Sequence, residues 1–378
     1  MKALLLGCGE MGGETLRDLY RYGNLDDIVV GTRTPEKVHS LLTGLRGTHT
    51  HVSAVPIDAG DEDALVALMK NTDVAVNCVG PNYRYELPVA RAAIRAHVHL
   101  VDMNDEFETT LKMLDLDEAA RVAGIIVVLG LGGSPGINNV LVRAAANQLD
   151  DVQEIHTSWV MSGADPGGPA LSYHLLYSLS GRGLTYHDGK FVEVQSFRDG
   201  KERLEFPDPV GSMDVYHIGH PEPIMLARSF PGAMLIDNKA SFNPPSVNDE
   251  IIRLGAMIRD GRGPRRENGR DMDVMDTAAL SLHRMCKGLD GVPKQAALRI
   301  HVKGIKKTKT RNIYFTSAGM LAPATGIPAA IGALMILGGK VAARGVLPPE
   351  QCLDPDDFLY EILTRRRVST LNGWIDEN

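Results

Sequence analysis

The feature that most constrains the fold is a glycine-rich turn that directly follows a short apolar stretch. Lys2–Leu6 is expected to be a first strand, and the next residues contain three glycines spaced G-x-G-x-x-G. In a dinucleotide-binding unit these glycines make a tight turn, admit a pyrophosphate and let helix and strand pack closely. Free N–H groups at the start of the following helix then receive the negative charge. The residues expected to hold the pyrophosphate are Gly7, Gly9, Glu10, Met11 and Gly12.

The end of the second strand indicates which dinucleotide binds. A chain that binds NAD usually places an Asp or Glu about 20 residues after the glycine turn, where it holds the ribose 2′-hydroxyl. Here the strand that begins at Asp27 ends with Gly31, Thr32 and Arg33, so the acid is missing and a cation follows. An arginine fork suits a phosphate. We therefore expect Thr32 and Arg33 to bind the 2′-phosphate of NADP, with NAD as the less favoured cofactor. The alternative for Arg33 is a helix cap or a solvated side chain.

Strand-like and helix-like stretches then alternate with short connections. Further strands are predicted over residues 51–57, 73–79, 99–102 and 125–129, and helices over residues 61–69, 87–96 and 107–122. Six strands separated by helices, with right-handed crossovers, predict an α/β fold with a doubly wound parallel sheet, the Rossmann architecture.

The pattern changes after a second glycine-rich turn at residues 130–136. Residues 137–149 are predicted to be a helix, and residues 152–314 alternate strand candidates with long polar loops and one helix, 249–259. This is typical of an α+β domain with a mixed sheet and helices on one face. In the tail we expect a helix rich in small residues over 325–335, a turn at 345–350 and an amphipathic helix over 356–367.

Composition excludes several classes of protein. The net charge of −7 and the pI of about 6.0 argue against a nucleic-acid-binding protein. Four widely spaced cysteines without a C-x-x-C pair are typical of a reducing compartment. The longest apolar stretch, residues 327–337, is too short to span a bilayer. We expect a cytoplasmic protein without a bound metal, a nucleic-acid partner or a membrane partner.

Polar residues follow the fourth and fifth strands, at the edge where open α/β sheets bind their ligands. Asn77, Gly80 and Pro81 are expected to line the nicotinamide ribose, against the alternative of simple turn chemistry for Gly80-Pro81. Asn82 and Tyr83 follow on the same edge and are candidates to reach the substrate. For Tyr83, a packed helix start is an equal alternative.

Asp102 and Asn104 end the fifth strand and are candidates to orient an amine or relay a proton. We predict Asp102, Tyr83 and Asn104 as catalytic residues. The alternative for Asp102 and Asn104 is a cap for the following helix, and Asp105 fits that capping role better.

The motifs together resemble those of the saccharopine dehydrogenase-like oxidoreductases, which include lysine 6-dehydrogenase and saccharopine reductase. The matching segments are residues 7–13, 33–37, 77–81, 99–102, 130–138, 325–330 and 344–350, with looser matches at 180–183, 188–190 and 220–223. The resemblance therefore covers the first 140 residues and the last 55 well, and the middle loosely.

The resemblance implies a discontinuous NADP-binding domain of residues 1–136 and 322–378, with residues 137–321 as an inserted α+β domain for substrate binding and dimerisation. It implies a homodimer built through the insertion, and Asp58 near the adenine, where a helix cap is an equal alternative. The activity it implies is hydride transfer between a nicotinamide and a carbon that bears nitrogen, usually in an amino acid.

The substrate residues follow from the same resemblance and from chemistry. Arg182 matches an arginine turn that binds a substrate carboxylate in the family, with a solvated loop arginine as the alternative. Amine oxidation requires a group that manages one proton; His217 and His220 can titrate near neutral pH, and Glu222 is a candidate partner. Arg182, Asn82 and Glu222 are thus the predicted substrate-binding residues.

Two reactions stay open within this family, deamination of a simple ω-amine and the formation or cleavage of a secondary amine. The length and loop style favour the first slightly. A different class of function is an NADP-bound sensor or scaffold without turnover. The polar edge formed by Tyr83, Asp102, Asn104 and Arg182 argues against it, because a redox sensor does not need these groups.

Overall fold

The structure is a computed structural model that describes residues 1–43, 49–165, 167–261, 266–267, 270–271, 273–365 and 370–377. The chain forms two compact units. The first unit contains Met1–Val140 and Ala322–Val368, and the second contains Leu141–Leu321 and Ser369–Asn378.

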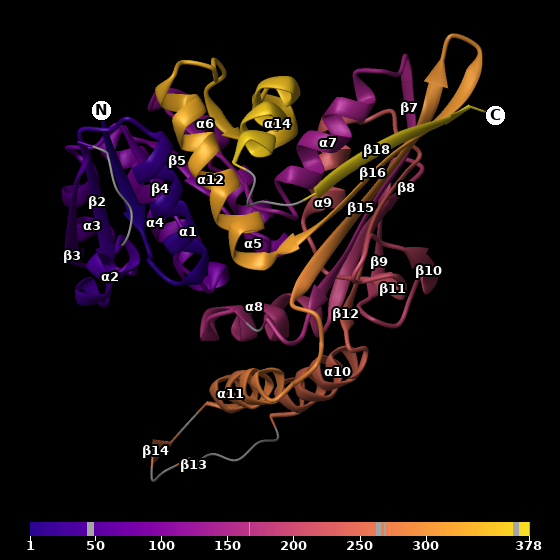
Figure 1. Cartoon of the computed structure of the whole chain (residues 1–378), viewed down its shortest axis with the longest axis horizontal. Coiled ribbons are helices and arrows are strands. Elements are labelled where there is room, and N and C mark those ends of the chain that lie inside the picture. The colour runs from indigo at the N-terminus through magenta and orange to yellow at the C-terminus, as the bar shows by residue number, and fades with distance from the viewer. Residues whose placement is uncertain are drawn as a thin grey trace. The chain divides into compact units, whose positions relative to one another are not determined.

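The first unit is built on a seven-stranded parallel sheet of order β17-β6-β5-β4-β1-β2-β3 (Figure 1). Its strands are β1 (Lys2–Leu6), β2 (Asp27–Thr32), β3 (His51–Pro56), β4 (Val74–Asn77), β5 (His99–Asp102), β6 (Ile126–Val128) and β17 (Gly345–Leu347). This confirms the predicted doubly wound parallel sheet. The strand order reverses beside β1, so the ends of β1 and β4 flank the switch point at which such sheets bind ligands.

Helices connect the parallel strands, lead out of the sheet after β6 or follow β17. They are α1 (Glu10–Tyr22), η1 (Pro35–Lys37), α2 (Val38–Leu41), α3 (Glu62–Met69), α4 (Asn82–Ala96), α5 (Phe107–Leu114), α6 (Asp117–Val122), α7 (Ile137–Ala146), α12 (Leu321–Leu337), α13 (Pro349–Cys352) and α14 (Pro355–Thr364). The single helix predicted over 107–122 is two helices. The amide of Leu116 bonds to the carbonyl of Met113, a tight i−3 bond that ends α5 before α6 begins.

Two predictions for the tail need correction. The turn expected at 345–350 begins with a short strand, β17, because Gly345 adopts a positive φ and Val346 can then pair beside β6 as a buried residue. Residues 370–377, expected in the first domain, form β18 (Thr370–Glu377) in the second unit. There β18 pairs antiparallel with β16 (Lys309–Met320) from Arg311↔Glu377 to Ala318↔Thr370.

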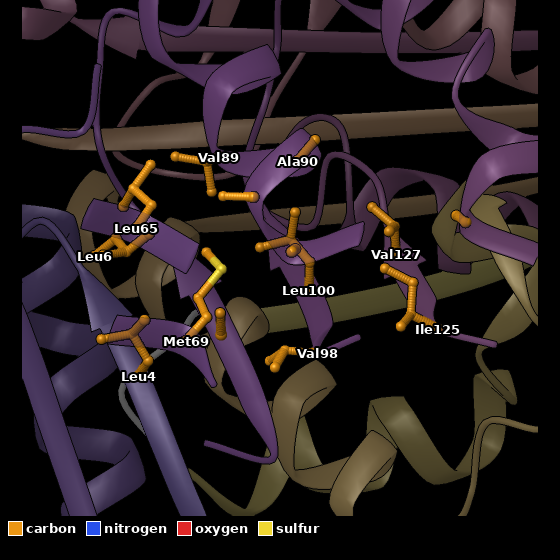
Figure 2. Close-up of a cluster of buried hydrophobic side chains, with 14 of the residues drawn as sticks. Leu4, Leu6, Leu65, Met69, Val89, Ala90, Val98, Leu100, Ile125 and Val127 are labelled. Carbon is orange, nitrogen blue, oxygen red and sulfur yellow. The ribbon is translucent and has the colours of Figure 1, made fainter. Parts of the chain in front are cut away.

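A buried apolar core fixes the first sheet against α3 and α4 (Figure 2). Alternate residues of a strand point to the same face, so Leu4 and Leu6 of β1 both enter this core. Residues drawn in Figure 2 include Leu65 and Met69 of α3, Val89 and Ala90 of α4, Leu100 of β5 and Val127 of β6. The packing holds the ends of the strands in place, which matters because the candidate site lies there.

The second unit is built on a nine-stranded mixed sheet, as the α+β prediction required. Its order is β10-β11-β12-β7-β15-β16-β18, with β8 paired to β12 and β9. The remaining strands are β7 (Asp151–Ser162), β8 (Arg182–His187), β9 (Lys190–Gln195), β10 (Glu202–Glu205), β11 (Ser212–His217), β12 (Leu235–Asn243) and β15 (Gln295–Lys306). A separate two-stranded piece contains β13 (Arg266–Glu267) and β14 (Arg270–Asp271).

In the described part of the chain, four helices lie wholly within this unit: α8 (Pro169–Leu179), α9 (Glu222–Ser229), α10 (Ser246–Arg259) and α11 (Val274–Lys287). The helix α7 enters the unit at Leu141. Apolar residues of α8, α10 and α11 pack with Trp159 of β7 and Phe242 of β12 in one buried cluster. Across the described ranges, neither unit contains a helix that is both long and apolar enough to cross a membrane.

Candidate functional site

The glycine turn after β1 adopts a backbone that requires two of its glycines. Gly7 has a φ of +82°, and a Cβ there would lie 2.8 Å from the carbonyl oxygen of Cys78. A Cβ on Gly12 would lie 2.3 Å from the carbonyl oxygen of Gly7, so α1 packs directly on the turn. Both positions therefore exclude a side chain for reasons internal to the fold.

Gly9 is different, because its own fold does not require a glycine. It is the N-cap of α1 with a φ of −76° and a ψ of −156°, an extended conformation open to other residues. Among the described residues, no heavy atom lies within 4 Å of the position of its missing Cβ. The absent side chain leaves open space at the N-terminus of a 13-residue helix, beside Glu10 and Met11. That space is open to an anion such as a pyrophosphate, which the amides of the first helical turn and the helix dipole would bind.

The end of β2 presents a cation to solvent. Thr32 is 8% exposed, and its Oγ1 accepts a hydrogen bond from the Thr34 amide. Arg33 is exposed and forms no ion pair with any residue that the structure describes. The N-cap of η1 is Thr34, so Arg33 does not cap that helix. An exposed, unpaired guanidinium at the carboxyl edge of the sheet is suited to an anionic ligand.

Asp58 forms a turn rather than a helix cap. Its Oδ1 accepts a hydrogen bond from the Gly60 amide at 2.9 Å. The cap of α3 is Asp61, whose Oδ1 accepts a hydrogen bond from the Ala64 amide at 3.0 Å. Asp58 is therefore not the cap of α3, and the Asp58 side chain instead stabilises the turn that follows β3.

Asn77, at the end of β4, points into the protein and organises the next segment. It is 2% exposed; its Oδ1 accepts from the Val79 amide, and its Nδ2 donates to Glu86 at 2.9 Å. Gly80 and Pro81 then lead into α4, with Pro81 as the N-cap. Of the residues expected on this edge, Gly80 and Pro81 offer backbone and ring surface to a ligand, while the side chain of Asn77 is already engaged.

The first turn of α4 carries Asn82 and Tyr83. Asn82 donates from Nδ2 to Oδ1 of Asp105 at 2.8 Å, which ties the start of α4 to the segment after β5. Tyr83 is half-buried at the helix start. Asn82, Tyr83 and Asp105 therefore lie on the same edge as the glycine turn, as the parallel arrangement of the strands requires.

Asp102 and Asn104 are fully buried and act on the backbone. Oδ1 of Asp102 accepts from the amides of Asn104 at 2.8 Å and Gly130 at 2.9 Å. Asn104 donates to Thr110 and accepts from the Glu106 amide. The N-cap of α5 is Glu106, so neither residue is that cap. Both side chains hold the segments after β5 and β6 in position.

Glu86, a fully buried carboxyl group in α4 within hydrogen-bond reach of Asp102, was not predicted from the sequence. Burial, reinforced by the negative charge of Asp102, raises the pKa of Glu86 well above its ordinary range. A signal did exist. Glu86 directly precedes the predicted helix 87–96. In α4 it shares a face with Val89, Ala90 and Ala93, at the i+3, i+4 and i+7 positions, so a helix extended by one residue would have placed a charge on the apolar face.

In the second unit, the predicted substrate residues occupy two different environments. Arg182 is exposed at the start of β8 and pairs with Glu193 of β9 at 3.2 Å. Glu222 is fully buried at the start of α9, and its Oε2 lies 2.5 Å from Nδ1 of His220. The structure thus brings Glu222 to His220 rather than to Arg182.

The His220–Glu222 pair lies among aromatic rings. The His220 ring is 5.5 Å from that of Trp159 and 6.4 Å from that of His174, measured between centroids. Strand β8 packs against the segment that leads to His220, because a Cβ on Gly183 would lie 2.4 Å from the Ile218 carbonyl oxygen. His217, the other candidate, ends β11, and burial lowers its pKa. It is therefore neutral near pH 7.

A glycine-rich turn at the switch point of a parallel sheet, in a chain whose second unit is a mixed sheet, is the arrangement found in oxidoreductases that bind a nicotinamide dinucleotide. Residues 3–128 match the saccharopine dehydrogenase NADP binding domain. The chain is 23% identical over 389 residues to carboxyaminopropylagmatine dehydrogenase of Synechocystis sp., covering 96% of this chain and 95% of the relative. It is 25% identical over 396 residues to carboxynorspermidine synthase of Vibrio alginolyticus, covering 95% and 94%.

A third relative matches over a shorter region. Saccharopine dehydrogenase (NADP+, L-glutamate-forming) of Schizosaccharomyces pombe is 27% identical over 227 residues, covering 54% of this chain and 45% of the relative. The fold is that of the apo saccharopine dehydrogenase of Saccharomyces cerevisiae, with a TM-score of 0.68, 17% identity and 99% of both chains covered. Residues 3–128 thus match the NADP-binding domain of the family that the motifs indicated, and over nearly its whole length the chain is similar to dehydrogenases and synthases that act on amines.

Proposed function

We propose that the protein is an NADP(H)-dependent oxidoreductase that forms or cleaves the C–N bond of a secondary amine carrying an amino-acid group. The proposal that the chain binds a dinucleotide rests on the open space at Gly9, at the N-terminus of α1. The proposed substrate class is supported by two relatives that match over nearly their whole length, because their names denote carboxylated amines. These relatives favour the formation or cleavage of a secondary amine over the deamination of a simple ω-amine, which the sequence alone favoured slightly.

NADP is favoured over NAD because Arg33 is exposed and unpaired within the described chain, next to Thr32 at the end of β2. For Arg33→Ala we expect the NADPH dissociation constant to rise about 10- to 100-fold, which is the loss of one charged hydrogen-bonding group. NADH, which lacks the 2′-phosphate, should bind as before. Titration of both nucleotides measures this, with Arg21→Ala at the other end of α1 as the control. An unchanged preference for NADPH in Arg33→Ala would rule out this role.

When bound, the nicotinamide accepts or supplies the hydride. The chain's own residues bind and orient it: the Gly7–Gly12 turn holds the pyrophosphate, Asp58 shapes the adenine side, and Gly80 with Pro81 lines the ribose. Tyr83, half-buried on the same edge, is the predicted catalytic residue with surface left to contact substrate. Asp102 and Asn104 contribute as positioning residues, because their bonds go to the backbone.

For the substrate, Arg182 is proposed to bind a carboxylate and Asn82 to contact the amino-acid group. Arg182 would exchange its surface partner Glu193 for the ligand, at small cost because the pair is solvated. Glu222 would act through His220, whose ring it orients, so that one imidazole nitrogen stays available to hold or move a proton.

The test of the reaction is a panel of primary amines, diamines and agmatine, each paired with an oxo-acid or an aldehyde-bearing amino acid. Consumption of NADPH, followed at the nicotinamide absorbance band, is expected only with pairs that condense to a carboxyl-bearing imine. Amino acids with NADP alone test the ω-amine alternative. Silence across the panel with tight NADP binding retained would favour a sensor or scaffold.

We also propose a homodimer assembled through the second unit, in the cytoplasm. A row of stacked rings at the edge of the nine-stranded sheet supports the dimer, since Trp374 at its end is 41% exposed. All four cysteines are free thiols, which supports a reducing compartment.

A further inference from the structure

We propose that Glu86 is a positioning residue whose protonated carboxyl donates a hydrogen bond to Asp102. The resulting pair holds together the segments that follow β4, β5 and β6, at the edge where the nicotinamide end of the cofactor binds. The link to the nicotinamide rests on the proposed function. The shared proton itself rests only on the buried side chains of the first unit.

The four carboxyl oxygens can be accounted for one by one. Oε2 of Glu86 accepts from Nδ2 of Asn77 at 2.9 Å, and Oδ1 of Asp102 accepts from two backbone amides. The remaining two oxygens, Oε1 of Glu86 and Oδ2 of Asp102, are buried and receive no donor from the described residues. The two carboxyl groups nevertheless lie within hydrogen-bond reach of each other. Two carboxylates have no donor to offer, so one proton must lie between them.

The surroundings place this proton on Glu86. Burial raises the pKa of Asp102 as well, but the backbone amides of Asn104 and Gly130 oppose that shift by stabilising its charged form. Glu86 receives only the Asn77 amide, while burial and then Asp102 raise its pKa well above the ordinary range. Among the described residues, the other titratable groups that act on the pair are Asp105 and Glu106, from the segment after β5, and the charge of each raises the pKa of one member of the pair.

This pair connects three loops through one proton. Asn77, held by Glu86, accepts from the Val79 amide at 3.1 Å after β4. Asp102 holds the Asn104 amide after β5 and the Gly130 amide after β6. Loss of the proton would place two negative charges in hydrogen-bond contact inside the protein, where water cannot screen them. The three loops would then separate, and the ligand edge would lose its shape.

Glutamine at position 86 reproduces the protonated glutamate. Its Nε2 can donate to Asp102 and its Oε1 can accept from Asn77, but it cannot ionise. Glu350→Gln is the matched control, because Glu350 is also buried and accepts from an asparagine, Asn139, at 2.9 Å in the same unit. Glu86→Leu removes both bonds and serves as the disrupted variant.

The first measurement is infrared spectroscopy of the full chain near neutral pH, where exposed carboxyl groups are ionised. We expect the C=O stretch of a buried protonated carboxylic acid in the wild type and in Glu350→Gln, and its loss in Glu86→Gln. Absence of the band in the wild type, or its persistence in Glu86→Gln, would overturn the proposal. This result does not depend on cofactor binding.

The second measurement is amide hydrogen exchange of the three loops against pH, with NADPH affinity measured in parallel. We expect the loops to exchange at least about tenfold faster in the wild type than in Glu86→Gln once the pH rises enough to remove the proton. NADPH affinity should fall by a similar factor in the wild type alone, and at every pH in Glu86→Leu. Equal exchange and affinity in wild type and Glu86→Gln at all pH values would refute the positioning role. Wild type that protects the loops but never binds NADPH would refute the proposed function instead.

Discussion

The three glycines of the first turn are required for different physical reasons. Gly7 and Gly12 are fixed by their own fold, since a side chain there would meet backbone at 2.8 Å and 2.3 Å. At Gly9 the backbone is ordinary and the space is open, so the fold does not require a glycine there, and a bound pyrophosphate is the proposed reason for the absence of a side chain. The spacing of glycines in the sequence predicts the turn but cannot separate these two kinds of requirement.

Replacing Gly9 by aspartate should separate binding from folding. Aspartate is a favoured N-cap, so the free energy of unfolding should stay within about 0.5 kcal/mol of the wild type or rise. Its carboxylate would occupy the pyrophosphate space, and we expect NADPH affinity to fall at least about 100-fold. Gly9→Ser is the control, a favoured cap without the charge. A destabilised Gly9→Asp, or one with unchanged NADPH affinity, would contradict this assignment.

Glu86 should make stability depend on pH in a defined direction. Its folded-state pKa is raised well above the unfolded value, so its contribution is complete at low pH and is lost as the pH rises toward the folded-state pKa. The loss can reach about 1.4 kcal/mol per pH unit within that window. Glu86→Gln cannot titrate, so it should gain stability relative to the wild type as the pH rises. Denaturant unfolding at a series of pH values, with Glu350→Gln as the control, measures this, and parallel curves would contradict it.

At the residue scale, sequence predicted which positions lie at the ligand edge better than it predicted what their side chains do. The carboxyl ends of parallel strands meet at one edge, so Asn77 and Asp102 were placed there from strand order alone. Their bonds to Glu86 and to the Gly130 amide join residues 9 and 28 positions apart. No local pattern encodes such bonds, and for that reason the Glu86–Asp102 pair was not predicted.

At the scale of elements, α12 shows why its sequence is rich in small residues. A Cβ on Gly326 would lie 2.2 Å from the carbonyl oxygen of Met11, so α12 lies directly against the first turn of α1. Thr15 of α1 also donates to the Gly326 carbonyl at 2.8 Å. The tail of the chain therefore supports the helix whose N-terminus is assigned to the pyrophosphate.

Gly326→Ala should therefore affect both stability and binding. The added methyl group meets rigid backbone, and we expect a loss of about 1–3 kcal/mol in the free energy of unfolding. NADPH affinity should fall as α1 moves away from the turn. Gly332→Ala, in the same helix, meets the end of the flexible Leu131 side chain and is the control with a smaller effect. Chemical denaturation and NADPH titration test this; equal effects of both substitutions would argue against a specific contact at Gly326.

Long periodic elements were predicted well, and short or paired ones were not. The apolar runs of β1, β4 and β6 stand out because both faces of a parallel sheet are buried. β17 has three residues before two prolines, too few for a periodic signal. β18 reads Thr-Leu-Asn-Gly-Trp-Ile-Asp-Glu, and its membership of the second sheet depends on pairing with β16, which only the structure shows.

For the whole molecule, the row of side chains across the second sheet is a feature that no single segment reveals. Successive strands place Asp237, His156, His301, Tyr314 and Trp374 directly opposite one another. The four rings stack with centroids 5.2, 4.4 and 5.0 Å apart along the row. Asp237 and Glu154 raise the pKa of His156 although burial opposes them. The row ends at β18, the edge strand, with Trp374 partly in solvent.

If the second unit forms the dimer through this row, a charge at Trp374 should separate the copies. Burying a charge in an interface is unfavourable, and symmetry repeats the substitution on both sides of a two-fold contact. We expect the wild type to have twice the 41.0 kDa mass of the chain by light scattering, and Trp374→Asp to have the mass of one chain. Trp374→Phe keeps the ring and should stay dimeric. Tyr360→Asp places the same charge on an exposed residue of α14 in the first unit and should also stay dimeric. A monomeric wild type, or a Trp374→Asp variant that remains dimeric, would exclude this surface as the interface.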